Sequence, residues 1–195
     1  MNKRDKLKNN SKLLSHYEKL NDLNILLEAQ FKESFNRSLP LPDHINDRWE
    51  RAKRLGFGDG SNIYDSSYVI GDVSVGKNCW IGMFTILDGS GSLSIGDGCT
   101  ISAGVHLYSH DNVMSTLSNN VIPIKREPVI IGRNCYVGPH SIISKGVTIG
   151  DFSVVAAHSF VNSSFPSNSI IAGVPAKRIG EVVIDGKEIS FKYFK

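Results

Sequence analysis

The sequence predicts an all-β core built as a coil of six-residue repeats, and three observations support this prediction. Between Ile63 and Val161 an aliphatic residue returns at nearly every sixth position. A small or modest side chain stands four residues after most of these aliphatic residues, and glycine directly follows many of them. A period of six fits neither the 3.6 residues of a helical turn nor the alternation of one long strand. It fits a solenoid in which three short strands and three corners close one triangular coil.

The aliphatic anchors form three runs with two interruptions between them. They are Ile63, Val69, Val75, Ile81 and Leu87; then Ile95, Ile101 and Leu107; then Ile131, Val137, Ile143, Ile149, Val155 and Val161. An anchor and the residue four positions later share one side of a strand, so both are expected to point inward. Cys79, Cys99 and Cys135 all follow an anchor by four, which predicts small buried fillers. The glycines after anchors are expected at corners, where they can take positive φ.

The two interruptions differ in size. Ile95 follows Leu87 by eight positions, so residues 88–92 are interpreted as a small bulge at one corner without a chemical role. Ile131 follows Leu107 by 24 positions, and about 18 residues near 110–128 are therefore expected to leave the coil as a loop. Long loops in compact domains are usually functional or disordered.

The ends of the chain have other patterns. Apolar residues recur at three- and four-residue steps over 11–37, which predicts a helix, and Asp47 is expected to cap a short helix through about Leu55. We therefore expect a helical N-terminal segment over 1–60 and a coil domain over 61–179. Residues 180–195 form a predicted tail with a hairpin around residues 185–186.

Composition limits the classes of function. A chain of 195 residues holds one core-bearing domain with additional ends, and a net charge of +3 gives no reason to expect a nucleic-acid partner. No stretch approaches the roughly 18 to 20 apolar residues of a membrane span, and the first 30 residues lack the apolar core of a signal peptide. These features predict a cytoplasmic protein without membrane insertion.

The histidines are the candidate chemical residues. His110 stands where the predicted loop departs, and His140 and His158 each follow an anchor by three, which stacks them about 5 Å apart along the coil. A neutral imidazole at His110 is suited to taking a proton from an alcohol that attacks a thioester. Alternatively, His106, His110 and His140 are zinc ligands, or all are exposed side chains on a structural spacer. Spacing alone leaves the three interpretations open.

Four segments resemble the hexapeptide-repeat acetyltransferases. They are 105–111 (VHLYSHD), 128–138 (PVIIGRNCYVG), 144–151 (SKGVTIGD) and 172–178 (AGVPAKR). This superfamily includes maltose and galactoside acetyltransferases and the O-acetyltransferases of bacterial surface polysaccharides. The start of the loop, residues 109–111, looks more similar to the surface-polysaccharide enzymes than to the maltose type. The resemblance covers about residues 63–179. It implies a left-handed parallel β-helix, a homotrimer with active sites between subunits, acetyl-CoA as co-substrate and no metal.

The resemblance also implies roles for individual residues. His110 would be the base that deprotonates a sugar hydroxyl for direct attack on acetyl-CoA, and Asp111 either orients it or simply begins the loop. The coenzyme is expected along one edge of the coil with its phosphates near Lys177. The predicted coenzyme-binding residues are Tyr136, Gly138, Ala156, Ala157, Ser159, Lys177 and Arg178. The candidate acceptor-binding residues are Met83, Trp80 and His106.

Departures from the family pattern limit what the resemblance implies. Met83 stands where the maltose and galactoside enzymes carry Asn, so their acceptor site is not reproduced. Pro139 has no N–H to offer a developing oxyanion. His158 replaces a small residue, and together with His140 it lines the expected coenzyme edge.

The sequence as a whole therefore predicts an acetyl-CoA-dependent O-acetyltransferase acting on a surface polysaccharide or its precursor. An N-acetyltransferase for a nucleotide-linked amino sugar is the alternative. A zinc hydratase of the gamma-carbonic-anhydrase type and a non-catalytic scaffold are less favoured.

Overall fold

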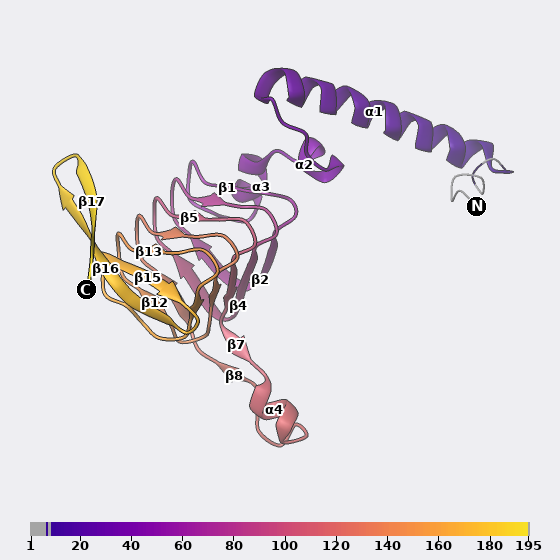
Figure 1. The fold of residues 1–195 in the computed structure, drawn as a ribbon. Helices are drawn as coiled ribbons and strands as arrows, with labels where there is room; N and C mark the ends of the chain where they lie inside the picture. Colours follow the sequence, from indigo (N-terminus) through magenta and orange to yellow (C-terminus); the bar gives the residue numbers. More distant parts are fainter. Residues whose placement is uncertain (1–6, 8, 195) are drawn as a thin grey trace. The chain divides into compact units, whose positions relative to one another are not determined.

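The computed structural model describes residue 7 and residues 9–194 (Figure 1), which form two compact units divided between Asp47 and Arg48. Residues 1–6 and 8 of the predicted helical segment lie outside the described residues. The first unit holds two helices, and the second holds two more together with the strands. The helices are α1 (Ser11–Phe35), α2 (Leu41–Ile45), α3 (Arg48–Arg54) and α4 (Val113–Leu117).

The long helix α1 begins and ends at asparagine caps. The side chain of Asn10 accepts a hydrogen bond from the N–H of Leu13 at 3.1 Å, which satisfies one of the free donors of the first turn. Asn36 takes the left-handed conformation (φ 52°) that commonly ends a helix. The helix predicted over 11–37 is thus confirmed. In the part of the chain that the structure describes, no helix has both the length and the hydrophobicity needed to cross a membrane.

The second unit contains a parallel β-helix with three faces (Figure 1). The first face consists of β1 (Asn62–Ile63), β3 (Trp80–Ile81), β5 (Thr100–Ile101), β10 (Tyr136–Val137), β13 (Val154–Val155) and β15 (Ser169–Gly173). The second face consists of the first halves of β2 (Tyr68–Val75) and β4 (Ile86–Ile95), with β6 (His106–Tyr108), β11 (Ile142–Ile143) and β14 (Phe160–Val161). The third face consists of the second halves of β2 and β4, with β9 (Val129–Ile131) and β12 (Thr148–Ile149).

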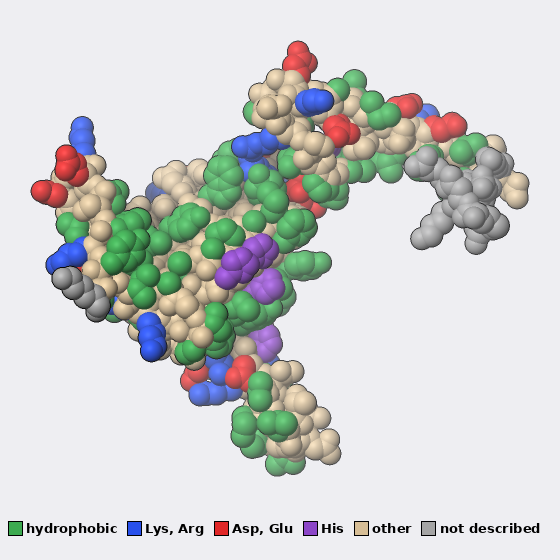
Figure 2. Space-filling model, in the orientation of Figure 1, with side chains coloured by type: hydrophobic (Ala, Val, Ile, Leu, Met, Phe, Trp, Pro, Cys, Tyr) green, Lys and Arg blue, Asp and Glu red, His purple; other side chains and the backbone are tan. Residues whose placement is uncertain are grey.

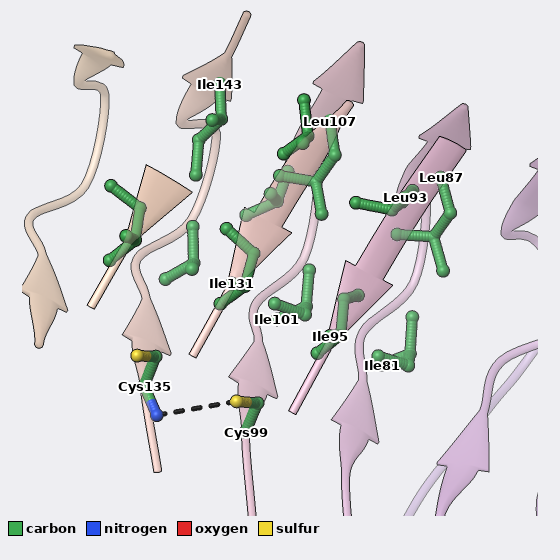
Figure 3. Packing of buried hydrophobic residues seen from close by; sticks show 14 of the residues in the cluster. Ile81, Leu87, Leu93, Ile95, Cys99, Ile101, Leu107, Ile131, Cys135 and Ile143 are labelled. Atoms are coloured by element: carbon green, nitrogen blue, oxygen red, sulfur yellow. Dashed lines mark hydrogen bonds between the residues drawn. The ribbon is translucent and has the colours of Figure 1, made fainter. Parts of the chain in front are cut away.

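The predicted anchors form the core of this coil. Every anchor except Val69, which lies on the first coil, is buried, and Figure 3 shows anchors of successive coils pointing into one interior. The three cysteines are free and buried, as predicted. Each thiol donates to a glycine carbonyl of the next coil, as in the 3.0 Å contact from Cys99 Sγ to the oxygen of Gly132. Anchors and small residues therefore fill the coil together.

The glycines that follow the anchors have a different role from the one expected. The prediction of positive φ at these positions is wrong, because they are absent from the residues with positive φ. Instead, the next coil passes too close for a side chain. A Cβ on Gly82 would lie 2.6 Å from the backbone nitrogen of Ala103, and one on Gly132 would lie 2.6 Å from that of Asp151. Glycine is needed here for close approach of backbones.

Positive φ occurs at the third residue after an anchor, which is the true corner of each repeat. The residues in this conformation are Asn78, Phe84, Gly98, Gly104, Asn134, His140, Gly146, Phe152 and His158. Asparagine and glycine reach this region at low cost, whereas aromatic side chains do so rarely. The corners are therefore positions where an aromatic residue calls for an explanation.

The two interruptions of the period also have distinct structures. The slip after Leu87 allows β4 to continue around a corner beside β2, with an irregularity in their pairing between Gly71 and Val73. The longer insertion leaves the coil on an antiparallel pair of strands, β7 (His110–Asp111) and β8 (Lys125–Arg126), and carries α4 at its tip (Figure 1). The extruded loop is thus confirmed.

The C-terminal end of the chain extends the first face. β16 (Ala176–Asp185) pairs antiparallel with β15 and then with β17 (Glu188–Tyr193). The predicted hairpin is present, with Gly186 and Lys187 between the paired ends of its strands.

The close packing between coils leads to a testable prediction about stability. Gly132→Ala should lower the free energy of unfolding by about 1–3 kcal/mol, because the new Cβ would force the next coil away. Asn134→Gly, two residues later in the same coil, should change stability by less than about 1 kcal/mol, since φ is already 53° there. Denaturant titration of the two variants checks this, and equal losses would contradict the close-approach explanation.

Candidate active site

The base of the extruded loop holds a hydrogen-bonded pair of His110 and Asp88. His110 Nδ1 lies 2.6 Å from Asp88 Oδ2, while Asp88 itself is 1% exposed. An ionised carboxylate can only accept, so Nδ1 must carry the proton of this bond. In the neutral ring that leaves Nε2 as the acceptor, and about a third of the His110 side chain is exposed to solvent. The ring is therefore oriented as a base toward the outside of the coil.

Asp88 is the site residue that sequence reasoning missed. It lies in the bulge that was expected to have no chemical role. In the ladder of the second face, Leu87 pairs with Leu107 and Asp88 pairs with Tyr108, so the bulge lies beside the start of the loop. The signal was present in the repeat: Asp88 directly follows an anchor, where glycine is common. An acidic residue at such a buried position requires partners.

Hydrogen bonds surround the Asp88 carboxylate. One oxygen accepts from the N–H and the hydroxyl of Ser90, at 3.0 and 2.5 Å, and the other accepts from the N–H of Ser109 at 3.0 Å. Burial raises the pKa of Asp88, but these bonds and the one from His110 outweigh burial, so the net pKa lies below its ordinary value. Asp88 therefore stays negatively charged beside His110.

Asp111, which was expected either to orient His110 or simply to begin the loop, makes its hydrogen bonds to other groups. Its carboxylate accepts from Lys145 Nζ at 2.5 Å and from the N–H of Val113 at 2.8 Å. The hydrogen bond from Lys145 is the main cause that lowers the pKa of Asp111. Lys145 belongs to the coil that follows the loop, so this ion pair joins the loop's base to the coil. The partner of His110 is Asp88, and Asp111 holds the loop.

His106 and Tyr108 lie in the same row as His110. Alternate residues of a strand share a face, and these three are half-buried while Leu107 and Ser109 between them are buried. The Tyr108 hydroxyl lies 3.2 Å from His106 Nδ1.

The predicted coenzyme-binding residues divide by exposure. Ala156 and Ala157 are accessible, and Tyr136 lines a groove of about 510 Å³ between the first face and the C-terminal hairpin. The side chain of Ser159 points into the coil, where its hydroxyl donates to the carbonyl of Ala156 at 2.7 Å. Gly138 is buried, with its Cβ position 2.6 Å from the nitrogen of Ala157. Side-chain contacts to a ligand are thus open to Tyr136 and the two alanines.

Lys177 and Arg178 lie on β16 at the end of the coil. Lys177 is exposed, whereas Arg178 is half-buried beside Glu181, with 3.9 Å between their charged atoms. The Arg178 guanidinium also lies 5.2 Å from the ring of Phe194. Lys177 is therefore the better placed of the two for an anionic group.

The predicted acceptor residues Met83 and Trp80 lie on the coil with other neighbours. Met83 is half-buried at a corner, where its carbonyl accepts from the N–H of Gly104. Trp80 is 41% exposed and lies 5.2 Å from the Arg48 guanidinium, so it packs against α3. His106 thus lies in the row that leads to the loop's base, whereas Trp80 contacts Arg48.

Two further predictions concerned the histidines: that His140 and His158 stack, and alternatively that histidines bind a metal. The rings of His140 and His158 are stacked, with centroids 5.2 Å apart, as the 18-residue spacing indicates. Within the described residues, no three His, Cys, Asp or Glu side chains are grouped so that they could hold a metal ion.

Comparisons with known proteins place this architecture in a family. A model of the bacterial transferase hexapeptide (six repeats) matches residues 128–163, and one of the hexapeptide repeat of succinyl-transferase matches residues 72–109. Galactoside O-acetyltransferase of Escherichia coli K12 is 33% identical over 149 residues, which cover 71% of this chain and 64% of that protein. The putative colanic acid biosynthesis acetyltransferase WcaF of the same strain is 34% identical over 113 residues, or 57% of this chain and 59% of that protein. The chain thus spans about three fifths of these curated relatives.

Solved structures agree on the fold. A galactoside acetyltransferase in complex with coenzyme A matches with a TM-score of 0.54 and 27% identity, over 83% of this chain and 82% of that chain. AntD, an N-acyltransferase from Bacillus cereus in complex with dTDP and 3-hydroxybutyryl-CoA, matches with a TM-score of 0.55 and 26% identity, over 67% and 86%. The fold is thus the left-handed parallel β-helix. The chain is thus built from hexapeptide repeats of bacterial transferases, which the two models match over residues 72–109 and 128–163, and it is similar to acetyltransferases that contain such repeats.

The lowered pKa of Asp88 predicts how this site responds to acid. A carboxyl with a depressed pKa in the folded protein stabilises the fold above its unfolded pKa of about 3.9 and loses that contribution as pH falls through the folded value. The Asp88 side chain should therefore remain mostly ionised at about pH 4, and its carboxyl carbon should keep the chemical shift of a carboxylate. Carbon-detected NMR titration checks this, with Asp88→Asn to assign the signal. Titration of Asp88 above pH 4 would contradict the assignment of its hydrogen bonds.

Proposed function

We propose that this protein is an acetyl-CoA-dependent O-acetyltransferase that modifies a sugar hydroxyl of a surface polysaccharide or its precursor. The observation that carries the proposal is the hydrogen bond from His110 Nδ1 to buried Asp88 at the base of the loop, which makes Nε2 the acceptor nitrogen of the neutral ring. The named relatives include a galactoside O-acetyltransferase and a putative colanic acid acetyltransferase, which supports transfer to a carbohydrate.

The proposed reaction is a direct transfer. Nε2 of His110 takes the proton of the acceptor hydroxyl as its oxygen attacks the thioester carbonyl. The new C–O bond forms, the C–S bond breaks, and the imidazolium returns its proton to the departing thiolate. The negative charge of Asp88 stabilises the imidazolium between these steps. Pro139 offers no N–H to the oxyanion, so another donor would have to act there.

The first face and its end fit a bound coenzyme. Small residues, Ala156 and Ala157, leave the edge of the coil open to an extended chain, and Lys177 is exposed near the end of that edge. When acetyl-CoA is bound, it supplies the activated acetyl group. The residues of this chain would hold the pantetheine arm along the edge and meet the phosphates with a positive charge.

Separate faces for the base and the coenzyme edge support a site shared between subunits. His110 lies where the second face meets the third, whereas Tyr136 lies on the first face. One copy therefore presents its base and its coenzyme edge in different directions. We propose a trimer in which the coenzyme edge of one copy faces His110 of the next.

An N-acyltransferase acting on a nucleotide-linked amino sugar is the second candidate. The likeness to AntD, whose structure contains dTDP and an acyl-CoA, favours it. An amine attacks a thioester with less help from a base than a hydroxyl needs, so the importance of His110 separates the two functions.

The decisive experiment measures acetyl-CoA consumption with three kinds of acceptor. Polymeric glycans and free sugars test O-acetylation, and nucleotide-linked amino sugars test N-acetylation. Turnover with the glycans supports the proposed function. Strong turnover with amino sugars alone would overturn it in favour of the second candidate.

Removing the base should abolish most O-acetylation. His110→Ala is expected to lower kcat by about 10²- to 10⁴-fold, the usual contribution of a general base. The matched control is His16→Ala on α1, whose ring bonds to the carbonyl of Lys12 within its own helix, and its kcat should not change. Steady-state kinetics checks both variants, and a loss of less than tenfold for His110→Ala would indicate an amine acceptor.

Removing the charge of Asp88 should slow the same step. Asp88→Asn retains the shape of the side chain but loses the charge that stabilises the imidazolium, so we expect kcat to fall by about ten- to a hundredfold. The KM for acetyl-CoA should stay within about twofold, because Asp88 is buried and its hydrogen bonds go to Ser90, Ser109 and His110 rather than to the proposed coenzyme-binding residues. An unchanged kcat would show that the pair is structural.

A further inference from the structure

Ser90 lies in the bulge that follows Leu87, and its hydroxyl takes no part in the proton transfer proposed above. In the registers of β4 with the strands beside it, Asp88 and Leu93 each have a partner, whereas residues 90–92 have none. The chain turns here, so that Ser90 meets the side chain of Asp88 two residues earlier, as residues after an aspartate often do in turns. The bulge therefore places a hydroxyl beside the carboxylate that binds His110.

The two oxygens of the Asp88 carboxylate have different partners. Oδ2 accepts from His110 Nδ1 at 2.6 Å and from the N–H of Ser109 at 3.0 Å, both at the start of the loop. Oδ1 accepts from the hydroxyl and the N–H of Ser90, at 2.5 and 3.0 Å. A hydroxyl that donates to a carboxylate at such a distance forms a strong, charge-assisted hydrogen bond. Ser90 thus holds one oxygen of the carboxylate while the other oxygen holds the imidazole ring.

The main chain beside Ser90 is packed against both ends of the loop. The N–H of Gly91 donates to Ser109 Oγ at 2.7 Å, and the N–H of Glu127 donates to the carbonyl of Ser109 at 3.0 Å. A Cβ on Gly91 would lie 2.4 Å from that carbonyl oxygen and 2.8 Å from the nitrogen of Glu127. The bulge is therefore fixed where the loop leaves and rejoins the coil, and Ser90 is held next to Asp88.

Loss of the Ser90 hydroxyl would leave a buried acceptor with a weaker set of donors. Asp88 is 1% exposed, so solvent does not replace a missing hydrogen bond at Oδ1, and such a loss is costly. The last torsion of an aspartate side chain has a broad energy profile, so the carboxylate can turn to find other donors. A turn of this kind would move Oδ2 away from His110 Nδ1.

The imidazole ring depends on this inner contact because its outer side is open. About a third of the His110 side chain is exposed, and Figure 2 shows histidine side chains at the surface, from the coil to the base of the loop. Which ring nitrogen carries the proton is set by the hydrogen bond that the other nitrogen makes, and here that bond comes from inside the protein.

Resting on the proposed function, in which His110 is the base, we propose that Ser90 is a positioning residue for that base and acts on it through Asp88. Its hydroxyl fixes the carboxylate so that Oδ2 receives the Nδ1 proton, which keeps Nε2 as the acceptor nitrogen for the hydroxyl to be acetylated. The electrostatics of the carboxyl agree: burial raises the pKa of Asp88, and the Ser90 hydroxyl heads the hydrogen bonds that lower it.

The first measurement locates the proton without an acceptor or coenzyme. Nitrogen NMR distinguishes a protonated from an unprotonated ring nitrogen, and His110→Ala identifies the signals of His110. The wild type is compared with Ser90→Ala, with Ser90→Thr, which keeps the hydroxyl, and with Ser94→Ala, which removes an exposed serine of the same strand. Position 90 lies outside the paired ladder and is half-buried, so these variants are expected to fold.

At about pH 8, where a free imidazole is neutral, wild type, Ser90→Thr and Ser94→Ala should show a protonated Nδ1 and an unprotonated Nε2. Ser90→Ala should show a mixture of the two tautomers. Its Asp88 carboxyl carbon should also titrate at a higher pH than in the wild type, because a hydrogen bond to the charged form is lost.

Steady-state kinetics measures the consequence for catalysis. Ser90→Ala should lower kcat about three- to tenfold, the effect of one hydrogen bond, with the KM for acetyl-CoA within about twofold of the wild type. Ser90→Thr should recover most of that loss, and Ser94→Ala should match the wild type.

The outcomes separate this proposal from the proposed function. A fully Nδ1-protonated ring and an unchanged Asp88 titration in Ser90→Ala overturn the positioning role. A loss of kcat that Ser90→Thr does not recover, with the tautomer unchanged, shows a structural role and overturns it too. If the tautomer changes in Ser90→Ala but the wild type transfers no acetyl group to any acceptor, Ser90 positions the ring and the proposed function is overturned.

Discussion

Close contact between the backbones of successive coils is the constraint on which the rest of this protein depends. Most strands pair in register with the strand one coil away, and the glycines after the anchors allow the next coil to approach. Because the coils stack so closely, most side chains lie directly beside the equivalent side chain one coil earlier. Columns of equivalent residues result, and the core, the thiol ladder and the stacked histidines are all such columns.

The candidate site arises where this regular stack is interrupted. The bulge after Leu87 places an acidic residue in a position that glycine usually occupies, and the ladder with β6 brings it beside the start of the loop. Because the inserted loop returns to the coil in register, Ile131 continues the third face beneath Ile95. The loop can therefore leave the coil at His110 without disturbing the core, and the ion pair of Asp111 with Lys145 holds its base.

Several features of the fold and the site were predictable from residue order. The anchors, the loop and the stacking of His140 on His158 all follow from counting in sixes, since the coil repeats every 18 residues. The role of the glycines was mistaken, because a sequence does not show whether a missing Cβ serves a turn or a close contact. The partner of His110 was left open, because Asp111 was expected either to orient the ring or simply to begin the loop. Adjacent Asp111 was the natural candidate, yet neighbours in a strand point to opposite sides, and Asp88 comes from 22 residues away.

The sequence by itself determined the repeating coil, its inward residues, the position of the loop and the candidate base, because each is a matter of period. The tertiary structure decided which groups meet. The anchor spacing records the slip of two residues in β4, but it does not show which side chains meet there. The parallel ladder of β4 and β6 sets Asp88 beside Tyr108, and the buried carboxylate there accepts the hydrogen bond of His110 from 22 residues away.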